Sequence, residues 1–92
     1  MKKTFSILLY TEPSHGWAKV KRQVLENLGI ADKISSYSYQ YNDNVYLEED
    51  RDFPLLLHRL YDDGVSVSIK TKHTDNRSRI RSYDPYEHQV KV

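Results

Sequence analysis

The chain has 92 residues, 38% of them hydrophobic, with no cysteine and a formal net charge of +1. This length closes a single core, so we expect one domain over residues 1–92, and the missing cysteine excludes disulfides and thiolate chemistry. The small net charge argues against attraction to nucleic acid by bulk charge. No apolar run reaches the ~20 residues that span a bilayer, and the run Ile7–Tyr10 is too short for a signal peptide, so we expect a cytoplasmic protein away from membranes.

The N-terminal part is expected to form a strand and a helix. Alternation of apolar and polar residues predicts a strand over Lys3–Tyr10. Apolar residues then recur at helical spacing from Trp17 to Leu28, which predicts a helix over about Ala18–Leu28 with Gly29 at its end. The first turn of this helix is open, because residues 17–20 could equally be extended.

The middle of the chain predicts a hairpin. Ser35–Tyr41 alternates strictly, residues 42–44 read Asn-Asp-Asn, and Val45–Glu49 returns as a second strand. In this strand Tyr37, Tyr39 and Tyr41 would share one face, where they could stack on nucleic-acid bases or pack across to the next strand.

A second helix and a last strand follow. Phe53 begins a series of apolar residues spaced i, i+3, i+4, i+7 and i+8, and Asp50 or Asp52 would cap the helix that they form. Gly64 ends this helix, and residues 65–72 alternate as a half-buried strand. Residues 73–92 are expected to be loop-like.

This order is β-α-β-β-α-β, which predicts an α+β fold of two layers, the ferredoxin-like motif. Two helices would cover one face of a four-stranded, mainly antiparallel sheet, and the other face would stay open. A small α+β sheet with a different strand order is the alternative, because the first helix is the weakest element.

Charge is segregated along the chain. Residues 1–40 carry +3, residues 41–63 carry −5 and residues 64–92 carry +3. The last part contains a basic segment that could bind an anionic partner, because guanidinium groups suit phosphates and carboxylates. Its residues are Lys70, Lys72, His73, Arg77, Arg79 and Arg81.

Two other interpretations of these charges remain open. The basic residues could instead pair within the fold with the acidic cluster Glu48, Glu49, Asp50 and Asp52. That acidic cluster lacks the spacing of a calcium loop. The four histidines are scattered, so we expect no metal, no cofactor and no catalytic residue; a small hydrolase using His15 or His73 is the weakest hypothesis.

Several short motifs suggest a relationship with known proteins. They are His15-Gly16-Trp17, the run from Leu28 to Ser35, Tyr37-Ser38-Tyr39, the run from Tyr46 to Asp50, and Ile80-Arg81-Ser82-Tyr83. Over residues 5–86 the chain resembles small uncharacterised accessory proteins of phages and plasmids. The resemblance implies an accessory protein of a mobile element, a kind of protein that often acts by binding host machinery, including CRISPR and other defence complexes, and no catalytic residue carries over from it.

We therefore expect a binding protein that modulates or inhibits a host protein complex in the bacterial cytoplasm through its charged, tyrosine-rich surface. The alternative is a nucleic-acid-binding module that uses residues 70–81. The sequence does not indicate an oligomeric state.

Overall fold

The structure is a computed structural model that describes residues 3–89. Residues 90–92 of the expected C-terminal loop lie outside this range. The described elements, in chain order, are β1 (Thr4–Thr11), β2 (Gly16–Lys21), α1 (Arg22–Asn27), the 3-10 helix η1 (Ala31–Lys33), β3 (Tyr39–Tyr41), β4 (Asn44–Glu48), α2 (Asp52–Asp62), β5 (Ser66–His73), the 3-10 helix η2 (Arg79–Ser82) and β6 (Asp84–Pro85).

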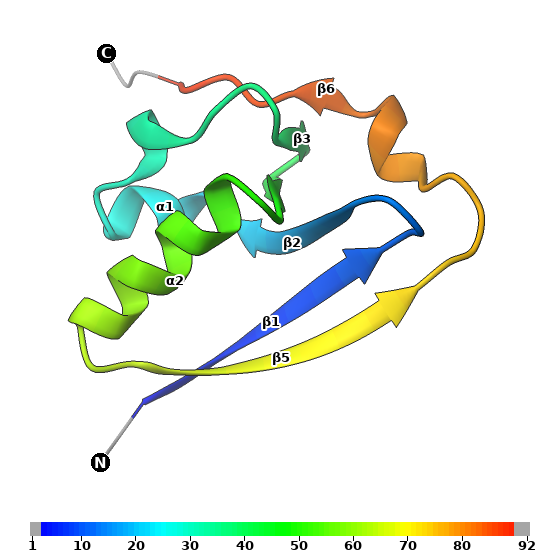
Figure 1. The fold of residues 1–92 in the computed structure, drawn as a ribbon. Coiled ribbons are helices and arrows are strands. Elements are labelled where there is room, and N and C mark those ends of the chain that lie inside the picture. Colours follow the sequence, from blue (N-terminus) through cyan, green and yellow to red (C-terminus); the bar gives the residue numbers. More distant parts are fainter. Residues whose placement is uncertain (1–2, 90–92) are drawn as a thin grey trace.

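These strands form one mixed sheet in the order β5-β1-β2-β4-β3-β6. β1 and β5 are parallel, and the other neighbours are antiparallel. β5 therefore lies at one edge beside β1, and the chain after β5 arches back to the opposite edge, where β6 pairs with β3 (Figure 1). We call residues 74–83 the returning segment; several of them belong to the candidate site.

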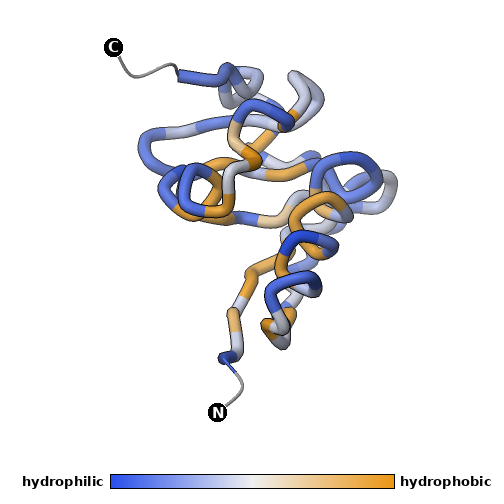
Figure 2. Tube along the Cα trace, turned by 90° about the vertical axis from the view of Figure 1, so that its left-hand side faces the viewer, coloured by the Kyte–Doolittle hydropathy of each residue, from blue (hydrophilic) through white to orange (hydrophobic). Residues whose placement is uncertain are grey.

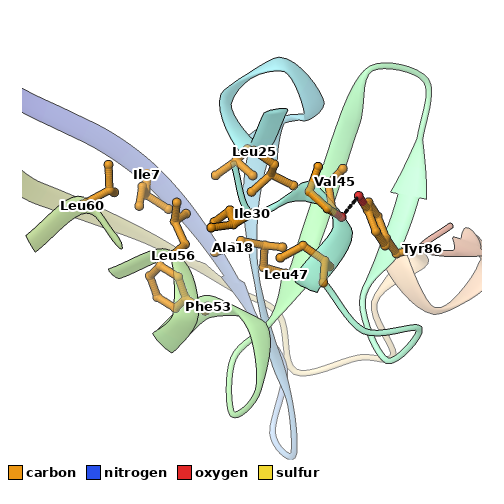
Figure 3. Packing of buried hydrophobic residues seen from close by; sticks show 13 residues of the cluster. Ile7, Ala18, Leu25, Ile30, Val45, Leu47, Phe53, Leu56, Leu60 and Tyr86 are labelled. Carbon is orange, nitrogen blue, oxygen red and sulfur yellow. Dashed lines mark hydrogen bonds between the residues drawn. The ribbon is translucent and has the colours of Figure 1, made fainter. Parts of the chain in front are cut away.

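One face of the sheet carries the main core. The register places Leu9 opposite Ala18 and Ala18 opposite Leu47, so their side chains share this face. Both helices pack on it, α1 through Leu25 and α2 through Leu56, and both of these leucines are fully buried (Figure 3). Figure 2 shows the hydrophobic stretches gathered toward the middle of the molecule, with hydrophilic loops around them.

The second face of the sheet has a smaller cluster of its own. Trp17, Tyr46 and Ile80 are buried together there, and Ile80 comes from η2. The returning segment therefore packs on the face that the helices leave uncovered.

The passage from α2 through Gly64 to β5 is confirmed, but β5 is not half-buried as predicted: it is an edge strand, and of its residues only Val67 is partly buried. Gly64 has a φ of 71°, a backbone conformation that residues with a Cβ seldom adopt. Neither Asp50 nor Asp52 caps α2, because Arg51 is at the N-cap position and makes no side-chain capping bond.

None of the helices within residues 3–89 is long and apolar enough to cross a membrane.

The hairpin is also confirmed, but its first strand is shorter than predicted. Asn42 turns the chain with a φ of 53°, and β3 pairs with β4. Residues 35–38 do not belong to β3, because Asp52 holds them in a turn: its carboxylate accepts hydrogen bonds from the backbone N–H and the hydroxyl of Ser35 and from the hydroxyl of Ser38. Tyr37 consequently lies in a turn and does not share a strand face with Tyr39 and Tyr41.

The predicted helix over Ala18–Leu28 is wrong in its first half, where the alternative of an extended stretch at residues 17–20 is confirmed. Gly16–Lys21 is strand β2, and only Arg22–Asn27 is helical. β2 is inserted between β1 and β4 and is covered on both faces, so Trp17 is buried on one face and Ala18 and Val20 on the other. Apolar residues on both faces obscure the two-residue alternation, and their spacing imitates a helix.

The fold is α+β, but the predicted four-stranded sheet is wrong. Over residues 3–89 the sheet has six strands, and the structure does not show the ferredoxin-like order, because β2 separates β1 from β4. The expectation of a loop after residue 73 is also wrong in part, since η2 and β6 form there.

Candidate binding site

A groove of about 730 Å³ lies on the second face of the sheet, beneath the returning segment. Four cationic side chains line it: Lys19 from β2, Lys72 from β5, and Arg77 and Arg79 from the segment that returns across the sheet. No carboxylate is among its lining residues. We call this hollow the basic groove; its other lining residues are Tyr10, Tyr46, Thr74, Asn76, Ser78, Ile80 and Tyr83.

The two arginines of the groove have no charged partner in the described part of the chain. Within residues 3–89, Arg77 and Arg79 form neither an ion pair nor a side-chain hydrogen bond. Four like charges around one hollow repel one another, and the potential that they create attracts anions. The groove is therefore suited to phosphate or carboxylate groups.

A row of four tyrosine rings begins in the groove: Tyr10, Tyr46 and Tyr83 line it, and Tyr41 continues the row beyond the lining residues. The ring centroids are 6.3 Å apart for Tyr10 and Tyr46, 5.1 Å for Tyr46 and Tyr83, and 4.7 Å for Tyr83 and Tyr41. The last two rings are stacked, with planes only 13° apart. Because these residues come from β1, β4, the end of η2 and β3, the row crosses most of the sheet. We call it the tyrosine row.

Tyr46 lies in the middle of this row and is the most buried of its rings. Burial raises the pKa of Tyr46 to about 12, and the nearby phenols of Tyr83 and Tyr10 add to the shift. The hydroxyl of Tyr46 is therefore protonated at neutral pH. It adds no negative charge to the groove.

Arg81 lies outside the basic groove and is engaged within the fold. Its guanidinium forms an ion pair with Glu12, in the turn between β1 and β2, and also contacts Nδ1 of His15. It lies 5.5 Å from the ring centroid of Trp17, on which His15 also stacks. The hydrogen bonds from Arg81 hold the pKa of Glu12 below its ordinary value.

A second hollow, of about 430 Å³, borders Arg81. Four of the five short motifs named in the sequence analysis contribute residues to it, although they are far apart in the sequence; the run from Leu28 to Ser35 does not. We call it the mixed hollow, because aromatic rings, two carboxylates and two guanidiniums line it: His15, Trp17, Tyr37, Tyr39, Glu48, Asp50, Arg51 and Arg81.

The structure separates the basic residues predicted from the sequence into those at the basic groove and those engaged elsewhere in the fold. Lys72, Arg77 and Arg79 line the basic groove, and Lys70 lies on the same face of β5 as Lys72. His73 and Arg81 point elsewhere, to Thr11 and Glu12 respectively. Within the described residues, no ion pair joins the basic segment to the predicted acidic cluster: the ion pair of Arg81 is with Glu12, and Asp52 is buried with serines.

Lys19 and the tyrosines of the groove were not predicted as site residues. Lys19 was missed because residues 18–28 were expected to be helical; in β2 it lies opposite Leu8 of β1 and Tyr46 of β4. Tyr83 lies in the part expected to be a loop. Among the tyrosines predicted to bind, only Tyr41 joins the tyrosine row. Tyr39 packs edge-on against Trp17, and the guanidinium carbon of Arg51 lies 4.1 Å from the ring centroid of Tyr37.

His73, one of the possible catalytic residues, is exposed and forms hydrogen bonds with two neighbouring side chains. Nδ1 of His73 lies 2.8 Å from the hydroxyl of Thr11, and Nε2 lies 3.1 Å from Asp75. The Asp75 side chain is 93% exposed, so water competes for it and it orients the imidazole weakly. Within residues 3–89, no three His, Asp or Glu side chains gather closely enough to hold a metal ion.

Comparisons of the chain with protein-family models, curated proteins and solved structures found no match.

Proposed function

We propose that this protein is a small non-enzymatic binding protein that holds an anionic partner in the basic groove. One observation carries the proposal: four cationic side chains surround a single hollow with no carboxylate among its lining residues. Two of them, Arg77 and Arg79, have all their guanidinium donors available to a partner.

The biological role that we propose is modulation or inhibition of a larger host complex in the bacterial cytoplasm, as the resemblance to phage and plasmid accessory proteins implies. The mixed hollow favours a protein as one component of that complex. Aromatic and guanidinium groups are enriched in protein–protein contacts, and this hollow has both beside the basic groove. The nucleic-acid alternative is favoured by a different observation, the tyrosine row, three rings of which line the groove.

The proposal is tested by removing charge from the groove. The double variant Arg77→Ala/Arg79→Ala should elute from heparin-agarose at a lower salt concentration than the wild type, because two of the four groove cations are lost. The matched control is Lys3→Ala/Lys33→Ala, which removes the same charge from exposed positions outside the groove. Equal elution of the two double variants would refute a groove-specific anion site.

The proposed role in a host complex needs a separate measurement. The tagged wild type and Arg77→Ala/Arg79→Ala should be used to capture proteins and nucleic acids from a bacterial lysate, with circular dichroism to verify that both are folded. We expect one set of components to be retained by the wild type and lost by the variant. A set retained equally by both would place the interaction on another surface.

A further inference from the structure

We infer that the anionic partner of the basic groove is single-stranded nucleic acid, with its phosphates against the four groove cations and its bases on the tyrosine row. This inference rests on the proposed function, because it requires the groove to be the anion site. It adds a class of partner that charge alone does not specify.

The groove combines two surfaces that an acidic protein would not use together. Its cations would attract any anion, but its aromatic rings have electron-rich faces that repel carboxylates. Nucleic-acid bases stack on such faces whatever their sequence, while the phosphates follow a cationic channel. A ligand that alternates phosphates with flat rings therefore fits both parts of the groove.

Tyr41 marks the open end of the tyrosine row. Its side chain is 52% exposed, whereas Tyr46 is buried and Tyr10 and Tyr83 are half-buried. Tyr41 already stacks in parallel on Tyr83, so the pair shows the geometry that a base would continue. We therefore assign the first stacked base to Tyr41.

A double helix does not fit this arrangement. Bases in a duplex are stacked on one another and hide their faces, whereas bases in a single strand can turn outward onto side chains. The sequence-tolerant character of stacking also predicts that single-stranded DNA and RNA of simple sequence will both bind.

The experiment compares four fluorescent probes of about ten units, within the range of site sizes of single-strand-binding modules. They are oligothymidylate, oligouridylate, an abasic oligonucleotide with the same phosphates, and oligoglutamate. We expect both base-containing probes to bind about tenfold more tightly than the abasic probe, which corresponds to one stacked base. Tyr41→Ala should remove about this factor for oligothymidylate and leave the abasic probe unchanged. The control is Tyr61→Ala, which removes an even more exposed tyrosine from α2 on the helical side of the sheet.

Salt dependence tests the contribution of the cations. With four phosphate contacts, the logarithm of affinity should fall against the logarithm of salt with a slope of about −2.8, and Arg77→Ala should reduce its size by about 0.7. Equal affinities for oligothymidylate and the abasic probe would overturn the inference of bound nucleic acid but not the proposed anion site. Tighter binding of oligoglutamate than of oligothymidylate would also overturn the inference and would indicate an acidic protein as the partner. Failure of every probe, together with unchanged heparin elution of Arg77→Ala/Arg79→Ala, would overturn the proposed function as well.

Discussion

Glu12 and Arg81 lie 69 positions apart in the sequence and meet in a two-point ion pair, with Nε of Arg81 donating to Oε1 at 2.8 Å and Nη2 donating to Oε2 at 3.1 Å. The same carboxylate accepts a hydrogen bond from the backbone N–H of Ser78. Glu12 therefore fixes both ends of the stretch from Ser78 to Arg81. This stretch contains Arg79 and Ile80, so one acidic residue holds a wall of the basic groove against the sheet.

Replacing Glu12 with Gln should loosen this wall. The substitution removes the charge that holds Arg81, while the amide has a similar size, so we expect a lower unfolding midpoint and weaker anion binding. Trp17 is the only tryptophan and packs under Arg81, so its fluorescence should shift toward that of an exposed indole. The control is Asp62→Asn on the exposed side of α2. An unchanged midpoint and an unchanged Trp17 spectrum would show that the ion pair does not hold the segment.

The same pair predicts a dependence of stability on pH. The hydrogen bonds from Arg81 keep the pKa of folded Glu12 below its ordinary value of 4.5. The stabilisation is therefore complete above pH 4.5 and is lost as the pH falls through the lowered pKa of the folded state. Urea unfolding between pH 7 and pH 3 should show this loss in the wild type. Glu12→Gln should have a flatter profile in that range, and identical slopes would contradict the prediction.

Local patterns predicted the elements whose partners are close in the sequence. α2, Gly64 and β5 follow from an apolar helical stripe, a glycine that ends the helix and an alternating sequence, although the burial of β5 does not alternate because it lies at the edge of the sheet. β2 was missed because both of its faces are buried, one in the helical core and the other under η2, so both carry apolar residues and the alternation is lost. Because β2 and the short β6 were both missed, the number of strands could not be predicted correctly.

The candidate site shows the same division. The sequence indicated Lys72, Arg77 and Arg79 because their charges cluster along the chain. It could not indicate that Lys19 lies with them, because this depends on the pairing of β2 with β1 and β4. Nor could it decide the partner of Arg81, since Glu12 and the acidic cluster carry the same charge and only the path of residues 74–83 selects between them.

Asp52→Ala tests how the turn before β3 is fixed. The buried Asp52 carboxylate accepts hydrogen bonds from Ser35 and Ser38, and Ser38 is itself fully buried. Its removal leaves these donors without an acceptor, so the free energy of unfolding should fall by about 2–3 kcal/mol. Asp50→Ala is the matched control, because Asp50 is exposed two residues away and should change stability by less than about 0.5 kcal/mol. Equal effects of the two substitutions, measured by urea unfolding, would contradict this role of Asp52.

Tyr46→Phe tests the buried centre of the tyrosine row. Since burial raises the pKa of folded Tyr46 to about 12 from an ordinary value of 10, its stabilising contribution is complete below pH 10 and is lost between pH 10 and pH 12. In an absorbance titration of the folded protein at the phenolate band, the wild type should show late ionisation from Tyr46 and also from Tyr86, whose pKa burial raises as well. Tyr46→Phe should lose the share of one tyrosine from this late step, and Tyr61→Phe should keep all of it, because Tyr61 is exposed on α2. An undiminished late step in Tyr46→Phe would assign the high pKa to other tyrosines and would place Tyr46 in contact with water.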